Sequence, residues 1–210
     1  MAPYVEFDST AVTDEWVERA CAGLAAGALL AHPTTTVYGV GAGESDLDRI
    51  ISRLKGRAAG IPILRLVFDS ARLRRVCPTA VWPRVASVLA EAFWPGPLTL
   101  VLDDESASGL AVRAESHPAT RAILSRWSGT LGSTSLNPSG APPARTLGEA
   151  RATLRAMADP GRPLLFVAAG DLAGPPPSTL LSLRGGEIRL LREGAIERSA
   201  LERVLGRKFD

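Results

Sequence analysis

Apolar residues recur along this chain with two periods, and segments of the two kinds alternate. From Thr13 to Gly27 the apolar positions have helical spacing, and Thr13 followed by acidic residues is typical of a helix start. The short apolar run at residues 28–31 is stopped by Pro33, which predicts a buried strand that leads into a polar loop. Further strands are expected at residues 61–68, 98–102, 110–113, 131–134, 164–168, 179–183 and 187–191, and further helices at 45–54, 81–92, 118–127, 147–157 and 198–205.

The order of these elements predicts the fold class. Strands and helices alternate through most of the chain, as they do in α/β proteins. The turn Arg184-Gly185-Gly186 between the last two expected strands is typical of a β-hairpin, so part of the sheet should be antiparallel. No internal repeat or linker interrupts the 210 residues. We therefore expect a single domain, 1–210, of the α/β class with an α+β-like mixed parallel and antiparallel sheet.

Composition limits the classes of function. Hydrophobic residues make up 46% and charged residues 22%, the balance of an ordinary globular protein. The formal net charge is only +2, so RNA binding would need a local basic patch. Cys21 and Cys77, with His32 and His117, match neither a disulfide framework nor a zinc motif, and we predict no protein ligand for a metal. The sequence shows no signal peptide or membrane span, so a cytoplasmic location is expected.

The first candidate for chemistry is a basic cluster at the end of the helix expected at 45–54. Lys55 and Lys208 are the only lysines in a chain rich in arginine, and Arg57 follows Lys55 across a glycine. An ammonium and a forked guanidinium on such a turn suit the oxygens of a polyphosphate. Basic residues also complement the dipole at a helix C-terminus, and the spacing alone favours neither explanation.

The second candidate is a polar segment that follows the short apolar strand at 131–134. Ser133, Ser135 and Asn137 could contact phosphate or ribose, although these residue types are also ordinary in turns. The common nucleotide motifs are missing, because segment 39–43 has the form G-x-G-x-G and no P-loop occurs. A serine hydrolase is disfavoured too, because there is no G-x-S-x-G and both histidines precede prolines in expected loop or cap positions.

Seven motifs, taken together and in order, point to one known family. They are P-T-x-T-x-Y-G at 33–39, K-x-R at 55–57, F-W-P-G-P-L-T at 93–99, A-V-R at 111–113, T-S-x-N-x-S-G at 134–140, P-S-T at 177–179 and R-x-G-A-I at 192–196. From about residue 20 to 196 the chain therefore resembles the YrdC-like (TsaC/YciO/YrdC) threonylcarbamoyl-adenylate synthases.

The resemblance implies a reaction and a set of site residues. In this family a twisted mixed sheet holds ATP, L-threonine and bicarbonate on a concave, positively charged face. A carbamate formed from threonine and bicarbonate attacks the α-phosphorus of ATP, Mg²⁺ helps to neutralise the phosphates, and pyrophosphate leaves. The L-threonylcarbamoyl-adenylate then serves to modify tRNA. The implied catalytic residues are Lys55 and Arg57; the implied ATP-binding residues are these two with Ser133, Ser135, Asn137 and Arg192; and the implied amino-acid or carbamate-binding residues are Thr36, Tyr38, Arg113 and Ser178.

This sequence departs from the family pattern at four positions. The family usually has an acidic residue at Thr35 and proline at Ala58, and it has lysine at Ile61 and often histidine at Leu66. Loss of the lysine and the histidine would remove charge and hydrogen bonds near the substrate. An enzyme that makes another carbamoyl-adenylate from a different amino acid is therefore one alternative.

A non-catalytic module that binds RNA or the ribosome is the other alternative. Arg72, Arg74 and Arg75 form a basic cluster that could contact phosphates, although such clusters are more often solvated helix faces. Binding of tRNA or of tRNA-modifying proteins would also fit the resemblance. No membrane partner is expected.

Overall fold

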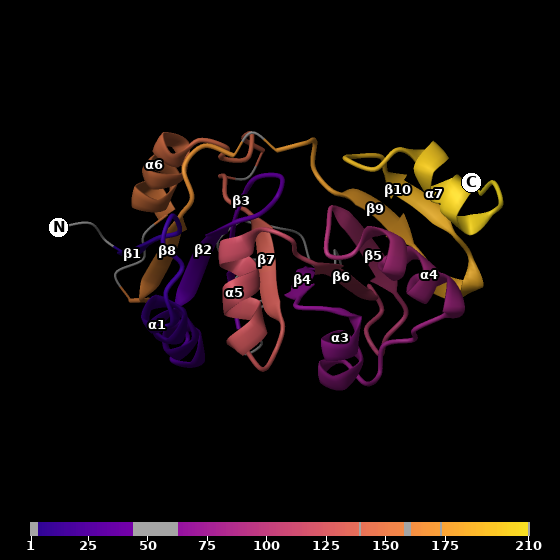
Figure 1. Ribbon diagram of the computed structural model, residues 1–210, viewed down its shortest axis with the longest axis horizontal. Helices are drawn as coiled ribbons and strands as arrows, with labels where there is room; N and C mark the ends of the chain where they lie inside the picture. The colour runs from indigo at the N-terminus through magenta and orange to yellow at the C-terminus, as the bar shows by residue number, and fades with distance from the viewer. Residues whose placement is uncertain (1–3, 44–62, 139, 158–160, 173, 210) are drawn as a thin grey trace.

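The computed structural model describes residues 4–43, 63–138, 140–157, 161–172 and 174–209, and their strands form one ten-stranded sheet. Its order is β1-β8-β2-β3-β7-β4-β6-β5-β9-β10 (Figure 1). The strands are β1 (Val5–Asp8), β2 (Leu29–Pro33), β3 (Tyr38–Ala42), β4 (Leu64–Val67), β5 (Leu98–Leu102), β6 (Leu110–Ala114), β7 (Leu131–Ser135), β8 (Leu164–Ala168), β9 (Thr179–Ser182) and β10 (Arg189–Arg192). The helices are α1 (Asp14–Ala25), α3 (Ser70–Val76), α4 (Arg84–Phe93), α5 (Pro118–Arg126), α6 (Leu147–Met157) and α7 (Arg198–Leu205). The helix expected at 45–54 lies outside the described residues.

Both kinds of strand pairing occur, so the predicted mixed sheet is confirmed. β1 and β2 each pair with β8 in parallel, as do β4 with β6 and β5 with β9. The pairs β2–β3, β3–β7, β4–β7, β5–β6 and β9–β10 are antiparallel. The expected hairpin joins β9 to β10 through the short 3-10 turn Arg184–Gly186. No helix in the described part of the chain is long and apolar enough to cross a membrane.

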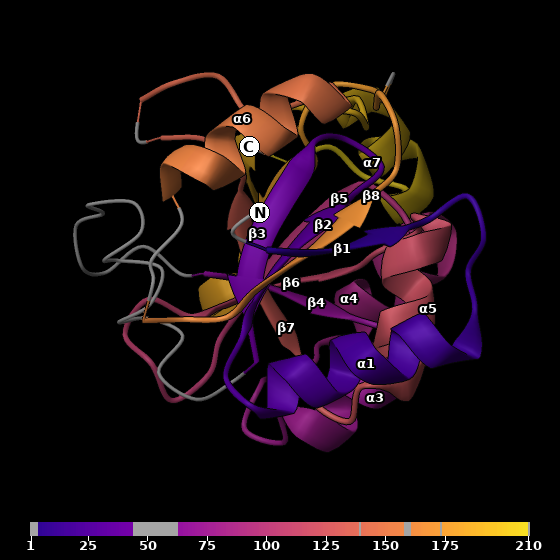
Figure 2. The same ribbon diagram turned by 90° about the vertical axis from the view of Figure 1, so that its left-hand side faces the viewer.

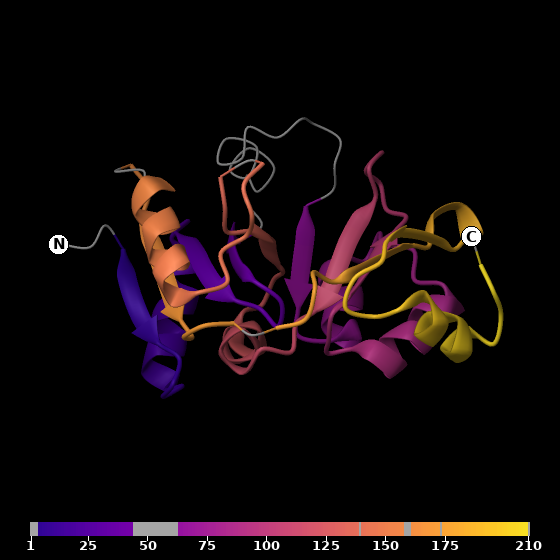
Figure 3. The same cartoon turned by 90° about the horizontal axis from the view of Figure 1, so that it is seen from above.

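The two faces of the sheet are covered differently. One face packs against α6 at one end and against α3, α4 and α7 at the other. On the opposite face, α1 and α5 pack over Leu30, Leu66 and Leu131. Figure 2 shows α1 and α5 together on one side of β2 and β8, with α6 on the other side. The N-terminus and the C-terminus lie at opposite ends of the long axis (Figure 3).

The glycine-containing segment after β2 was expected to be a loop, but most of it is strand. β2 includes Pro33, and β3 begins at Tyr38 after a short turn. A Cβ at Gly41 would lie 1.6 Å from the carbonyl oxygen of Gly132 in β7, so the close approach of the two backbones requires glycine. The expectation for His32 was also wrong: it lies within β2 and is fully buried, not in a loop or cap.

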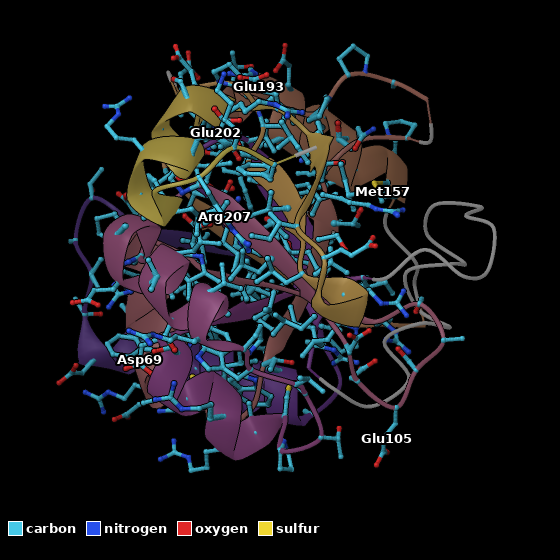
Figure 4. The ribbon with its side chains drawn as sticks, turned by 90° about the vertical axis from the view of Figure 1, so that its right-hand side faces the viewer. Asp69, Glu105, Met157, Glu193, Glu202 and Arg207 are labelled. Atoms are coloured by element: carbon cyan, nitrogen blue, oxygen red, sulfur yellow. The ribbon has the colours of Figure 1, made fainter. Side chains whose placement is uncertain are left out.

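Besides β3, the elements β1 and α3 were not predicted from the sequence. α3 begins after Asp69, which is labelled in Figure 4. Its carboxylate accepts a 2.6 Å hydrogen bond from the backbone N–H of Arg72. α3 carries the basic cluster considered for RNA binding. The Arg72 guanidinium donates to the carbonyl oxygen of Trp127, and the Arg74 guanidinium lies 5.8 Å from the ring centre of Trp82. These two side chains therefore have partners within the protein.

Candidate active site

A cleft of about 690 Å³ occupies the part of the sheet that α1 and α5 leave uncovered. Its floor comes from β3, β7, β4, β6, β5 and β9, and β10 lines one side. Gly39 pairs with Ser135 across β3 and β7, and both line the cleft. Val40, the neighbour of Gly39 along β3, packs into the core on the opposite face of the sheet, as the two-residue period of a strand requires. Small residues on one face therefore leave room for a ligand.

The turn between β2 and β3 places threonine hydroxyls at the edge of this cleft. The Thr34 backbone N–H donates to the Val37 carbonyl oxygen at 3.1 Å, and the Thr34 hydroxyl donates to the same oxygen at 2.7 Å. The Thr34 hydroxyl also accepts from the backbone N–H groups of Thr36 and Val37, each at 3.2 Å. Thr36 lines the cleft beside this network. The turn is thus fixed by its own side chains before any ligand binds.

A buried ion pair lies at the end of β6. The guanidinium of Arg113, which is 3% exposed, donates to Oε2 of Glu115, which is fully buried. Oε1 of Glu115 accepts from the backbone N–H and the hydroxyl of Thr35, at 3.0 and 3.2 Å, and from the N–H groups of Ser116 and His117. Burial raises the pKa of the Glu115 carboxyl, but Arg113 and these donors outweigh burial and lower it below the usual value. Glu115 is therefore ionised at neutral pH.

One nitrogen of Arg113 is left over by this pairing. Arg113 lines the cleft, and its buried Nε has no hydrogen-bond partner among the residues that the structure describes. A buried donor without an acceptor is costly. Because the Arg113 side chain also lines the cleft, its positive charge favours a ligand oxygen there.

A second arginine reaches the cleft through an irregularity in β10. Leu190 pairs with Leu181, but Arg192 pairs with Leu180 after a shift in register. Leu180 and Arg192 both line the cleft, whereas strict alternation would place Arg192 on the same face as Leu190. The Arg192 guanidinium donates to the Ser178 carbonyl oxygen, with its closer nitrogen at 2.8 Å. Burial, with the nearby charge of Arg113, lowers the pKa of Arg192.

The family follows from comparison with known proteins. The family model Sua5_yciO_yrdC, described as "Telomere recombination", matches residues 22–194. The chain belongs to the Sua5/YciO/YrdC family. Two relatives are named "Threonylcarbamoyl-AMP synthase". The protein from Halorhodospira halophila is 36% identical, and the match covers 64% of this chain and 75% of the relative. The protein from Bacillus subtilis is 30% identical, and the match covers 95% of this chain and 59% of the relative.

A solved structure of the same family agrees in fold. "P. abyssi Sua5 complexed with L-threonine" matches with a TM-score of 0.82 and 26% sequence identity, over 98% of this chain and 62% of that one. Our chain thus spans about three fifths of the length of the Bacillus subtilis relative and of this structure.

The structure gathers most of the described residues that the family motifs had singled out. The cleft is lined by Thr36, Arg113, Ser133, Ser135, Ser178 and Arg192. Tyr38 was expected among the amino-acid-binding residues, but it is fully buried on the opposite face of the sheet, where its hydroxyl donates to the Gly170 carbonyl oxygen at 2.6 Å. The amide of Asn137 donates to the carbonyl oxygens of Pro138 and Ala141, so it holds the turn after β7.

The remaining predicted residues are not among the described residues that line the cleft. Four of them lie outside the described residues: the predicted catalytic pair Lys55 and Arg57, and the positions Ala58 and Ile61 at which the sequence departs from the family pattern. Leu66 is fully buried in the core beneath α1 and α5. It pairs with Arg113 across β4 and β6, so its side chain lies on the same face of the sheet as the cleft, and the expected effect of the missing histidine stays a prediction.

Sequence reasoning missed two functional candidates, Glu115 and His32. Glu115 follows Arg113 by two residues, and this spacing puts both side chains on one side of an extended chain. That spacing was the available signal. His32 gave no such signal, because its contact with Ser133 joins strands that are far apart in the sequence.

Proposed function

We propose that this chain forms L-threonylcarbamoyl-adenylate from L-threonine, bicarbonate and ATP and releases pyrophosphate, as a nucleotidyltransferase that supplies tRNA modification. The observation that carries the proposal is the pair of arginines in the cleft, Arg113 and Arg192. The names of the relatives and the threonine complex of P. abyssi Sua5 support the same activity.

The charges in the cleft favour anionic ligands. Arg113 is balanced by Glu115, and Arg189 at the rim is paired with Glu187 at 2.8 Å. Arg192 lines the cleft without a carboxylate partner in the described part of the chain, and it lies close enough to Arg113 for their charges to interact. A phosphate, carboxylate or carbamate oxygen would relieve this repulsion and satisfy the donors.

Such a site can promote the reaction without a protein nucleophile. The threonine amine takes up the carboxyl group of bicarbonate with loss of water, and a carbamate oxygen attacks the α-phosphorus as pyrophosphate leaves. Catalysis then consists of holding the two substrates in line and offsetting the charge on the reacting oxygens. We assign the phosphates to Lys55, Arg57 and Arg192 and the amino acid or carbamate to Thr36, Arg113 and Ser178.

Mg²⁺ fits this site only as a companion of ATP. Among the residues described, no group of three or more His, Cys, Asp or Glu side chains could hold a metal ion. The Glu187 carboxylate at the rim is already paired with Arg189. The ion would therefore be bound by the phosphates, where it supplies neutralising charge.

Pyrophosphate release from ATP and bicarbonate, measured across a panel of amino acids, tests the proposal. Release with L-threonine alone is the expected result. Release with a different amino acid would favour the divergent enzyme, and no release with any amine, together with salt-sensitive RNA binding, would favour the binding module.

Substitution of Lys55 and Arg57, the residues assigned to the phosphates, offers a more specific test. We expect Lys55→Ala and Arg57→Ala each to abolish adenylate formation while the thermal unfolding midpoint is unchanged. Lys208→Ala and Arg207→Ala are matched controls, because both residues are exposed near the C-terminus. Arg207 is labelled in Figure 4. Near-normal turnover in the Lys55 or the Arg57 variant would contradict the assignment.

A further inference from the structure

A buried histidine lies beside a serine of the cleft floor, on the same face of the sheet. His32 in β2 is fully buried, and its Nε2 lies 3.1 Å from the Ser133 hydroxyl oxygen in β7. Ser133 lines the cleft. Gly39 in β3 lies between them in the sheet, and a Cβ there would come within 2.9 Å of the Ser133 oxygen and 3.0 Å of the His32 ring. The absence of a side chain at Gly39 thus permits the contact.

The other ring nitrogen fixes the tautomer. His32 Nδ1 lies 3.4 Å from the carbonyl oxygen of Pro33, which can only accept a hydrogen bond. A proton on Nδ1 makes this contact favourable, and Nε2 then carries the lone pair. In the opposite tautomer the Nδ1 lone pair would face the carbonyl oxygen, which is unfavourable. That tautomer would still make only one hydrogen bond between Nε2 and Ser133, so it gains nothing in return.

His32 stays neutral in its surroundings. Burial lowers its pKa to about 4, with smaller contributions in the same direction from Arg113 and His117. Glu115 and the Pro33 carbonyl act in the opposite direction but do not outweigh burial. At neutral pH the imidazole therefore accepts a hydrogen bond at Nε2, and the Ser133 hydroxyl must donate it.

We propose that His32 is a positioning residue that holds the Ser133 hydroxyl proton away from the cleft, so that Ser133 accepts a hydrogen bond from an N–H or O–H group of the bound substrate. A hydroxyl has one proton, and here the proton is committed to Nε2. Ser133 therefore offers only lone pairs to the cleft and repels phosphate and carboxylate oxygens. This excludes the phosphate contact that the sequence alone suggested as one possibility for Ser133.

The proposal rests on the proposed function only for the identity of the substrate. The donor group would belong either to the amino acid, through its amine or hydroxyl, or to the ribose or adenine of ATP. Separate KM values for L-threonine and ATP distinguish the two sources, because Ser133→Ala should raise the KM of the substrate that donates. An effect on pyrophosphate binding in the reverse reaction would instead indicate a phosphate contact and would overturn the proposal.

A double-mutant cycle tests the role of His32. We expect His32→Leu, which removes the acceptor, to lower kcat/KM about ten-fold, the effect of one hydrogen bond. His32→Gln, whose amide oxygen can accept from Ser133, should restore part of this loss. In the Ser133→Ala background the same His32→Leu change should cost nothing further, because its partner is gone. Additive effects of the two substitutions would overturn the proposal.

Spectroscopy decides the polarity of the hydrogen bond even without activity. Long-range ¹H–¹⁵N spectra of the full chain should show His32 as the neutral Nδ1–H tautomer at pH 7, and Ser133→Ala should shift the Nε2 resonance. A protonated Nε2 would refute the proposal. If the wild-type chain released no pyrophosphate with any amino acid, the proposed function would fail, whereas the tautomer measurement would still test the role of His32.

Discussion

Removal of the Glu115 carboxylate is the perturbation with the largest expected effect on this site. Glu115 balances the buried Arg113 and accepts hydrogen bonds from the turn at Thr35 and from the start of α5. Glu115→Ala would leave the guanidinium buried without its counter-charge and would leave several N–H groups without an acceptor. Breaking a buried ion pair from one side costs about 3–5 kcal/mol. That is a large part of the roughly 5–15 kcal/mol that stabilises a typical domain.

Glu115→Gln separates the loss of charge from the loss of shape. The amide keeps one accepting oxygen, but its NH₂ group must face either Arg113 or the N–H donors at Thr35, Ser116 and His117. We expect an intermediate destabilisation of about 1–3 kcal/mol, the usual effect of an unsatisfied buried polar group. Because Arg113 would lose its anchor, both variants should also raise the KM for the amino acid.

Urea unfolding at several pH values measures this contribution. The pKa of Glu115 is lowered in the folded protein from its ordinary 4.5, so the carboxylate stabilises the fold fully above that pH. Its contribution is lost as the pH falls below 4.5 and through the lowered pKa of the folded state. The difference in free energy of unfolding between the wild type and Glu115→Gln should become smaller over that pH range. Glu105→Gln is the control, because Glu105 is exposed in the loop between β5 and β6 (Figure 4). Equal stability of the Glu115 and Glu105 variants at pH 7 would refute the reasoning.

Two further predictions concern residues that the motifs grouped together. Tyr38→Phe should lower the free energy of unfolding by about 1–2 kcal/mol, because the hydrogen bonds between the hydroxyl and Gly170 and Ala169 are lost. The KM of each substrate should be unchanged. A raised KM for threonine would show that Tyr38 does contribute to binding. Arg192→Ala should raise the KM for ATP roughly ten- to hundred-fold, the effect of a charged hydrogen bond. Arg189→Ala at the rim should change it little, and equal effects of the two variants would count against a specific role for Arg192.

The sequence predicted the buried apolar strands well, but it did not predict β1 and β3. Apolar runs identified β5, β6 and β8, because a buried strand must be apolar wherever helices or other strands cover it. β3 was missed because Gly39 and Gly41 resemble a flexible loop, whereas here glycine permits close contact with β7. β1 was missed because it is a four-residue edge strand with only Phe7 buried, which leaves almost no pattern.

The motifs identified residues near the cleft but could not say which face each one occupies. Thr36 and Tyr38 belong to one motif, yet Thr36 lines the cleft while Tyr38 begins a strand and points into the opposite core. Arg192 shows the reverse effect. Alternation from Leu190 would turn its side chain away, and only the irregular pairing of β10 brings it into the cleft. Such shifts arise from tertiary pairing and leave no mark in the spacing of apolar residues.

The departures from the family pattern have a structural explanation where the structure describes them. Thr35 replaces a usual acidic residue, and its N–H and hydroxyl both bond to the carboxylate of Glu115. A negative charge therefore lies beside this turn, contributed by the end of β6, and it is the charge that balances Arg113. Leu66, in place of a frequent histidine, pairs directly with Arg113 across β4 and β6 and is buried beneath α1 and α5. The change at Thr35 therefore leaves a carboxylate beside the turn, whereas the change at Leu66 places an apolar side chain next to Arg113 on the cleft face of the sheet.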